Sequence, residues 1–205
     1  MPRPRFRRLT DEQQTRILDA ALDEFAAHGY RGASLNRIIA NTGVSKGSMY
    51  YYFDGKEDLY THVIRDGLEQ LLAEGGGVAL PAPTDPDAFW ASLESQYLHL
   101  MRRLAASPRL GAVLRDWLSG TGIPALSSAQ HEAEQEAMPW LTQTLATGQA
   151  IGAVRTDLPP DLIIALAMGM GQAIDTWLIT RPPDEEGLEN AVHVLMSTMR
   201  RALEP

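Results

Sequence analysis

Apolar residues recur at helical spacing along almost the whole chain, and no segment shows the strict alternation of a half-buried strand. Near the N-terminus, one helical stripe of apolar side chains comprises Ile17, Leu18, Ala21, Leu22 and Phe25. Before this stripe, Thr10 and Gln13 form a capping-box pattern, and after it Gly29 is a helix stop signal. The pattern therefore predicts a first helix that begins after Thr10 and ends near Gly29.

Two shorter helical patterns follow, separated by a tight turn at residues 41–44. Ser34 is placed to cap the first of them, and Ser45 to cap the second. Met49 and Phe53 lie four residues apart and are the core candidates of the second short helix. The three tyrosines at 50–52 cannot all be buried, because neighbours on a helix point about 100° apart. The three patterns together predict a helix-turn-helix.

Further helical stripes fill the rest of the chain and bring the expected number of helices to about nine. Their predicted ranges are 56–74, 86–104, 107–119, 124–147, with a bend or restart at Pro139, 159–180, and a final helix through 188–199. Glycine and proline dominate residues 75–86, which indicates a loop between two bodies. We expect an all-α fold with a disordered basic arm (1–9), a helix-turn-helix domain (10–55), a connecting helix (56–74) and a C-terminal helical domain (75–205).

The net charge of −8 is divided unevenly along the chain. Residues 1–60 hold nine basic and eight acidic side chains, whereas residues 61–205 hold nine basic and eighteen acidic ones. This asymmetry is typical of a basic nucleic-acid-binding domain on an acidic body. Phosphate attraction acts locally, because salt screens charges beyond roughly 8 Å under physiological conditions.

Composition argues against several other classes of protein. The chain has no cysteine, and its five histidines include no i, i+4 metal-binding pair, so we expect no metal and no cofactor. It has no nucleophile elbow and no phosphate loop, because Gly75–Gly77 follow a helix rather than a strand, and an enzyme is not expected. The apolar stretch 162–174 is too short to span a bilayer, and no signal peptide is evident. We therefore expect a cytoplasmic protein without a membrane partner.

The second helix of the helix-turn-helix carries the chemistry expected for contact with DNA. Lys46 can donate to guanine or phosphate, Gly47 lets the backbone approach the bases, and Ser48 can bond a base edge. Phosphate contacts are expected from the tyrosine hydroxyls of Tyr50, Tyr51 and Tyr52, from the helix start at Ser34, and from Arg37 and Lys56. Arg3, Arg5, Arg7 and Arg8 either lie along a minor groove or form a solvated tail. A core role for the tyrosines and a solvated Lys46 remain the alternatives.

These residues resemble the DNA-binding domain of TetR-type (TetR/AcrR) transcriptional regulators. The matching features are Phe25-x-x-x-Gly29-Tyr30, Ser34, Ile38-Ile39-Ala40, Thr42-Gly43-Val44-Ser45-Lys46-Gly47, Tyr50-Tyr51-x-Phe53 and Lys56-Glu57-Asp58-Leu59. The resemblance covers about the first 60 residues, and beyond them only the helical layout and length are similar. Asn41 and Tyr52 depart from the family pattern, which usually has a small apolar residue at the first position and often histidine at the second.

The resemblance implies a homodimer that represses transcription at a palindromic operator and releases it when a small molecule binds the C-terminal domain. It places the DNA contacts on Ser34, Arg37, Ser45, Lys46, Gly47, Ser48, Tyr50, Tyr51, Tyr52 and Lys56. A constitutive or activating helical DNA-binding protein without ligand control is the alternative. Inducible release from DNA would separate the two.

The same resemblance, read with the apolar stripes, gives candidates for the two C-terminal functions. The ligand-binding candidates are Trp90, Tyr97, Met101, Trp117, Trp140, Met168, Gln172 and Asp175. The dimer-interface candidates are Ala165, Gly169, Leu188, Val192, Leu195, Met196 and Met199. Aromatic and methionine stripes are also common in simple cores, and Asp175 fits either a cationic ligand or a paired interface carboxylate.

Overall fold

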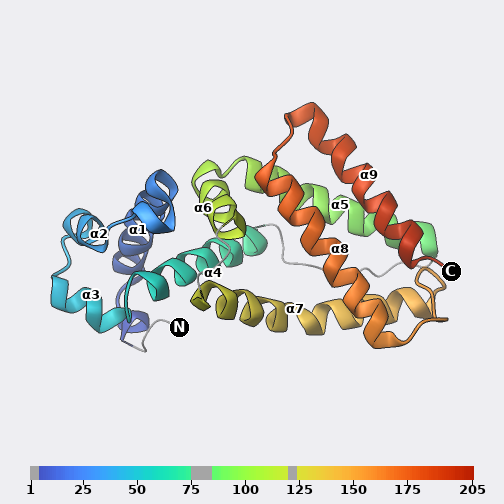
Figure 1. Cartoon of the computed structure of the whole chain (residues 1–205), viewed down its shortest axis with the longest axis horizontal. Coiled ribbons are helices and arrows are strands. Elements are labelled where there is room, and N and C mark those ends of the chain that lie inside the picture. Colours follow the sequence, from blue (N-terminus) through green and yellow to red (C-terminus); the bar gives the residue numbers. More distant parts are fainter. Residues whose placement is uncertain (1–4, 75–84, 120–123) are drawn as a thin grey trace. The chain divides into compact units, whose positions relative to one another are not determined.

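The computed structural model describes residues 5–74, 85–119 and 124–205. Within these ranges the chain forms nine α-helices and one short 3-10 helix, and no strand (Figure 1). The helices are η1 (Phe6–Arg8), α1 (Asp11–Gly32), α2 (Leu35–Thr42), α3 (Lys46–Tyr52), α4 (Lys56–Glu74), α5 (Pro86–Ala105), α6 (Pro108–Ser119), α7 (Pro124–Ala150), α8 (Pro160–Thr180) and α9 (Glu185–Leu203). The all-α prediction is confirmed, and α7 runs through Pro139 as one helix.

The helices form two compact units. The first unit comprises Met1–Leu71 together with Ser107–Gln130, and the second comprises Leu72–Ala106 together with His131–Pro205. This division differs from the sequence prediction, which placed the whole of 75–205 in the C-terminal domain. Helix α6 belongs instead with the helix-turn-helix, because its side chains are bonded to α1 and α4.

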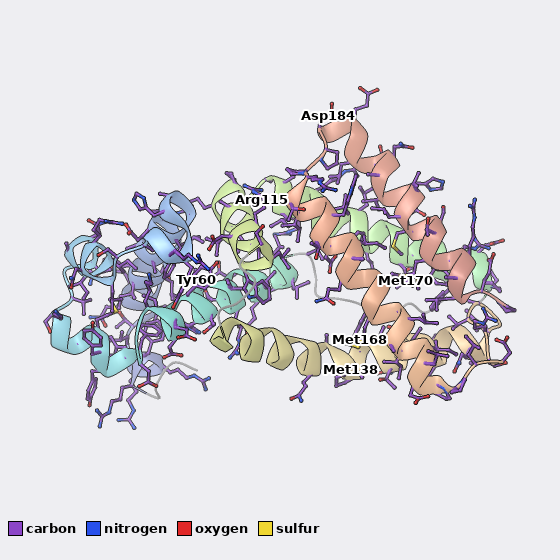
Figure 2. All side chains as sticks on the ribbon, viewed as in Figure 1. Tyr60, Arg115, Met138, Met168, Met170 and Asp184 are labelled. Atoms are coloured by element: carbon purple, nitrogen blue, oxygen red, sulfur yellow. The ribbon has the colours of Figure 1, made fainter. Side chains whose placement is uncertain are left out.

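The carboxylate of Asp116 is the centre of this attachment of α6. It accepts a hydrogen bond of 2.8 Å from the hydroxyl of buried Tyr60, which Figure 2 labels on α4. It accepts another of 2.7 Å from the backbone N–H of Tyr30. Burial, and then the bond to Asp116, raise the pKa of Tyr60, so its phenol stays protonated and remains a donor.

Helix α1 begins and breaks where the sequence predicts. Thr10 and Gln13 form the capping box, with bonds of 3.2 and 3.3 Å between backbone and side chain. Gly29 interrupts the helical geometry at φ 62°, a region that favours glycine. A Cβ atom at Gly29 would also lie only 2.8 Å from the Asp116 carboxylate, so α6 packs directly over this kink.

The N-terminal arm differs from its prediction. Residues 1–4 lie outside the described residues, but Phe6–Arg8 form η1 rather than a disordered tail. The side chain of Phe6 is only 1% exposed. An aromatic residue between arginines therefore anchors this part of the arm to the first unit.

The second unit has its own apolar core, built mainly from α5, α7 and α8. Its buried residues are Phe89, Trp90, Leu145, Ala153, Val154, Ile163, Ala167 and Leu203. Gly148 permits close packing there, because a Cβ atom would lie 2.5 Å from Val154 and 2.8 Å from Phe89. Ion pairs from Arg102 to Glu189 and from Arg200 to Asp87 join α5 to α9.

Helices α8 and α9 use their apolar stripes differently. On α9, Leu188, Val192 and Met196 are buried inside the second unit, and Met199 packs against its core. Within one copy of the chain these four interface candidates therefore contribute to the core, and Leu195 is half-buried. On α8, by contrast, the predicted interface residues Ala165 and Gly169 are exposed.

The exposed surface of α8 is unusually apolar. Leu162, Leu166 and Trp177 are exposed beside Ala165 and Gly169, and we call these five residues the apolar α8 face. By length and composition alone α8 could span a membrane, a property that core helices of soluble proteins share. The helix extends beyond the stretch 162–174 that the sequence analysis judged too short. Since exposed apolar patches commonly mark interaction sites, this face is available for a partner.

Candidate nucleic-acid interface

The turn between α2 and α3 is fixed by local hydrogen bonds. Thr42 is buried, and its hydroxyl donates to the carbonyl of Ile39 at 3.0 Å and accepts from the N–H of Val44 at 3.3 Å. Gly43 follows with φ 67°, a left-handed conformation that ends α2. The side chain of Ser45 then caps α3 by accepting from the N–H of Ser48 at 3.0 Å. These contacts set the direction in which α3 leaves the turn.

Helix α3 has one buried face and one exposed face. Met49 is fully buried, and Phe53 directly after the helix is 1% exposed. Tyr50 and Tyr51 are 46% and 45% exposed, and Tyr52 is half-buried. The core prediction for Met49 and Phe53 is confirmed. The three tyrosines differ in exposure, as the 100° between neighbouring residues requires. Lys46 and Gly47 are exposed, as are Tyr50 and Tyr51.

Gly47 has no structural reason to be glycine. It lies in a regular helix, and a Cβ atom there would meet only the Ser45 hydroxyl oxygen, at 3.9 Å. A glycine in a helix costs about 1 kcal/mol relative to alanine, and here the fold gains nothing from it. A missing side chain at an exposed position next to Lys46 instead leaves room for something that approaches from outside.

Two predicted phosphate contacts are engaged inside the fold. Arg37 donates from Nε to the buried carboxylate of Glu24 at 2.8 Å and from Nη2 to the carbonyl of Gly32 at 2.9 Å. Glu24 also accepts from the N–H of Ser34 at 2.7 Å, so the Ser34 side chain does not cap α2. The bond from Arg37 lowers the pKa of Glu24. Arg37 therefore compensates a buried charge, which the sequence analysis missed because Glu24 lies thirteen residues away.

Lys56 is the second of these residues. Its ammonium group donates to the backbone carbonyls of Arg31 and Ala33, at 3.3 and 3.1 Å, and lies 4.6 Å from the centre of the Tyr30 ring. A lysine at this position satisfies carbonyls at the end of α1. The structure thus assigns Lys56 to joining α1 and α4, and leaves the exposed face of α3 as the main candidate for contact with DNA.

The ligand-binding candidates fall into different environments. Trp90 belongs to the core, and its indole N–H donates to the Ala153 carbonyl at 3.1 Å. Met101 is buried, whereas Gln172 is exposed and Met168, labelled in Figure 2, is half-buried. Trp117 lies on α6, in the first unit. The other seven candidates lie on α5, α7 and α8 of the second unit.

Tyr97 and Asp175 form the main polar pair of the second unit. The Tyr97 hydroxyl donates to the Asp175 carboxylate at 2.6 Å, which joins α5 to α8. Burial raises the pKa of Asp175, against the lowering effect of this bond, and burial likewise raises the pKa of Tyr97. Within the described ranges no cation pairs with Asp175. Asp175 is half-buried, and a carboxylate partly removed from water with only a neutral partner is an uncommon arrangement, because burial of a charge normally needs compensation.

Several buried polar atoms on α5 and α7 also lack a partner in the described part of the chain. They are the side-chain carbonyl oxygen of Gln96, the indole nitrogen of Trp140 and the hydroxyl of Thr144. Gln96 adjoins Tyr97 on α5, and Trp140 and Thr144 lie one turn apart on α7. Groups of this kind are usually satisfied in folded proteins, by water or a ligand if not by the chain.

The fold and this site define a helix-turn-helix DNA-binding protein with a separate helical domain. Residues 17–63 match the family model described as bacterial regulatory proteins, tetR family. The HTH-type transcriptional repressor SCO4008 of Streptomyces coelicolor is 30% identical over 171 residues, covering 82% of this chain and 79% of that protein. The chain belongs to the TetR family of bacterial transcriptional regulators.

Solved structures agree with the fold along the whole chain. FadR of Bacillus subtilis in complex with stearoyl-CoA is 22% identical with a TM-score of 0.68, covering 90% of this chain and 98% of that one. SmeT, the repressor of the Stenotrophomonas maltophilia multidrug efflux pump SmeDEF, is 18% identical with a TM-score of 0.70, covering 98% and 93%. At these identities the likeness establishes the fold and not the ligand.

Proposed function

We propose that this protein is a homodimeric repressor that binds a palindromic operator through α3 and releases it when a small molecule enters the second unit. The observation that carries the DNA-binding part is the exposed face of α3, where Lys46, Gly47, Tyr50 and Tyr51 lie in front of a buried Met49. Gly47 allows backbone approach, and Lys46 supplies a donor for guanine or phosphate. The alternative remains a constitutive or activating DNA-binding protein without ligand control.

The apolar α8 face supports the dimer. A second copy of the chain would cover Leu162, Leu166 and Trp177, and the small residues Ala165 and Gly169 would permit close approach of two helices. Most soluble homo-oligomers are two-fold symmetric, so the same face would be used by both subunits. A two-fold dimer would then present two copies of α3 to successive major grooves, whose centres lie roughly 34–36 Å apart.

Selection of bound DNA from a random pool, at fixed near-physiological salt, tests this proposal. The expected product is a palindrome whose half-sites lie about one helical turn apart. The variant Leu166→Glu, which places a charge in the proposed interface, is expected to be a monomer by light scattering and to lose the palindrome. Its matched control is Gln143→Glu, which adds a similar charge at an exposed polar position of α7, outside the apolar α8 face. Recovery of no motif by the wild-type protein would contradict the proposal.

The effector site is proposed to lie among α5, α7 and α8, around Tyr97 and Asp175. Asp175 lies about 200° around the helix from Trp177, since each residue turns by about 100°. It therefore points away from the apolar α8 face, and its bond to Tyr97 of the same chain supports a ligand role over the role of interface carboxylate. An uncompensated carboxylate favours a cationic, largely apolar effector over an anionic one.

Two ions of nearly the same shape and opposite charge test this charge preference. Tetraphenylphosphonium is expected to raise the melting temperature and change tryptophan fluorescence, whereas tetraphenylborate is not. Asp175→Asn keeps an acceptor for Tyr97 and is expected to weaken cation binding by at least about tenfold, or about 1.4 kcal/mol. Equal cation affinity in the wild type and Asp175→Asn, or preference for the anion, would refute a cationic effector.

Release of DNA would be a shift between two populations. Helix α4 begins in the first unit and ends in the second, so it is a covalent path by which an effector could change the spacing of the two copies of α3. The effector can shift this equilibrium only by its differential affinity for the two states. Displacement from the selected operator by a ligand that binds the second unit would distinguish this protein from a constitutive DNA-binding protein.

A further inference from the structure

The N-terminal arm is attached to the C-terminal end of α3 by an aromatic cluster. The Phe6 ring lies 4.8 Å from the ring of Phe53, which directly follows α3, and 5.4 Å from the ring of His62 on α4. It also contacts Tyr52, the last residue of α3, at 6.2 Å. Since Phe6 is 1% exposed, residues next to it have a defined position relative to the proposed DNA-binding helix.

The cluster is suited to a neutral ring rather than a charged one at His62. Burial, and then the nearby Arg65, lower the pKa of His62 to about 4, with Arg7 also contributing. The imidazole is therefore uncharged near pH 7 and packs as an aromatic ring against Phe6 and Phe53.

The arginines on either side of Phe6 carry exposed positive charge. The guanidinium group of Arg5 lies 3.7 Å from the centre of the exposed Tyr51 ring, and Arg7 and Arg8 are exposed. In the described ranges none of the three forms an ion pair, whereas Arg37, Arg109, Arg155 and Arg200 each pair with a carboxylate. Anchored, unpaired cations beside a DNA-binding helix are suited to phosphate oxygens.

We propose that the anchored arm is a second DNA contact, in which Arg5, Arg7 and Arg8 bind backbone phosphates just outside the bases faced by α3, and Phe6 is the positioning residue. This inference rests on the proposed operator binding. Phe53 lies seven residues beyond Lys46, or about 10 Å along a helix, so the arm adjoins the end of α3 remote from the proposed base contacts. The contact therefore falls on the flank of each half-site and depends little on its sequence.

The test compares two duplexes that contain the same selected operator. One ends at the outermost specified base pair, and the other extends by ten base pairs on each side. Affinities of the full-length protein are measured by fluorescence anisotropy over a series of salt concentrations. The wild type is expected to bind the long duplex at least about tenfold more tightly than the short one. The slope of its log affinity against log salt concentration is expected to be steeper, by the equivalent of about three phosphate contacts per half-site.

Four variants separate positioning from charge. The triple variant Arg5→Gln, Arg7→Gln, Arg8→Gln and the single variant Phe6→Ala are both expected to lose the advantage of the long duplex, although Phe6→Ala keeps every charge. Phe6→Leu, which can still anchor the arm, is expected to retain most of it. Arg16→Gln removes an exposed arginine of α1 and is expected to leave the affinity for both duplexes unchanged. Circular dichroism establishes that each variant is folded.

The outcomes distinguish this inference from the proposed function. A wild type that selects an operator but binds the short and long duplexes equally would overturn the arm contact alone. If Phe6→Ala bound both duplexes more weakly by the same factor, while Phe6→Leu bound as the wild type does, Phe6 would be only a core residue. This result would also overturn the arm contact. A wild type that selects no operator would instead count against the proposed function itself.

Discussion

In Gly47→Ala, operator affinity is expected to fall by about tenfold to a hundredfold, while the folded protein becomes slightly more stable. The added methyl group meets only an ordinary contact at 3.9 Å within the protein, and alanine is preferred to glycine in helices by up to about 1 kcal/mol. The same methyl group would hold α3 away from the base edges, where each good contact is worth about 1–3 kcal/mol. Urea unfolding and anisotropy titration measure the two effects separately.

Gly43 provides a matched control for this substitution. Its φ of 67° is the left-handed conformation, which costs other residues roughly 1–2 kcal/mol, so Gly43→Ala is expected to lose stability. Lys46→Ala, which removes a donor without adding bulk, is expected to weaken operator binding. It is also expected to reduce the slope of log affinity against log salt concentration by the equivalent of about one phosphate contact. Unchanged operator affinity in both Gly47→Ala and Lys46→Ala would refute the assignment of α3 as the DNA-binding element.

Asp116→Ala is expected to lower the free energy of unfolding by about 2–3 kcal/mol. The substitution removes a charged acceptor that serves the Tyr60 hydroxyl and the Tyr30 N–H, and hydrogen bonds to charged groups contribute about 1.5–3 kcal/mol each. Tyr60 retains the Val113 carbonyl at 3.2 Å as a second acceptor, which limits the loss. Urea unfolding followed by circular dichroism gives the total effect.

Hydrogen–deuterium exchange would locate the effect of Asp116→Ala. Faster exchange is expected in α1, α4 and α6, the helices that Asp116 joins, with little change in α8 and α9. Asp87→Ala is the control, because its ion pair with Arg200 is on the surface, where the Asp87 side chain is 84% exposed, and such pairs contribute under about 1 kcal/mol. Equal destabilisation by the two substitutions would show that Asp116 has no special structural role.

The sequence predicted well whatever depends on neighbours along the chain. The capping box at Thr10, the cap at Ser45 and the burial of Met49 and Phe53 all follow from local chemistry and helical spacing, and the structure confirms them. The same local patterns predict the helix-turn-helix and carry the resemblance to the TetR family. What it could not provide was the partner of any side chain that reaches a distant segment.

The contacts that the sequence did not reveal have this common cause. Arg37 and Lys56 have the appearance of free surface cations until Glu24 and the carbonyls at the end of α1 are placed beside them. Helix α6 joins the first unit through Asp116, which lies 86 residues from Tyr30. The stripe on α9 is periodic enough for either an interface or a core, and its packing inside the second unit could not be read from the sequence.

The internal use of Arg37 and Lys56 has a consequence for attempts to retarget the protein to a new operator. A library that varies these two positions would mostly select for folding, since each change would orphan Glu24 or the end of α1. Variation confined to Lys46, Ser48, Tyr50 and Tyr51 would leave those contacts intact. We therefore expect altered specificity to be obtained from this short exposed surface, with the remainder of the first unit kept constant as a scaffold.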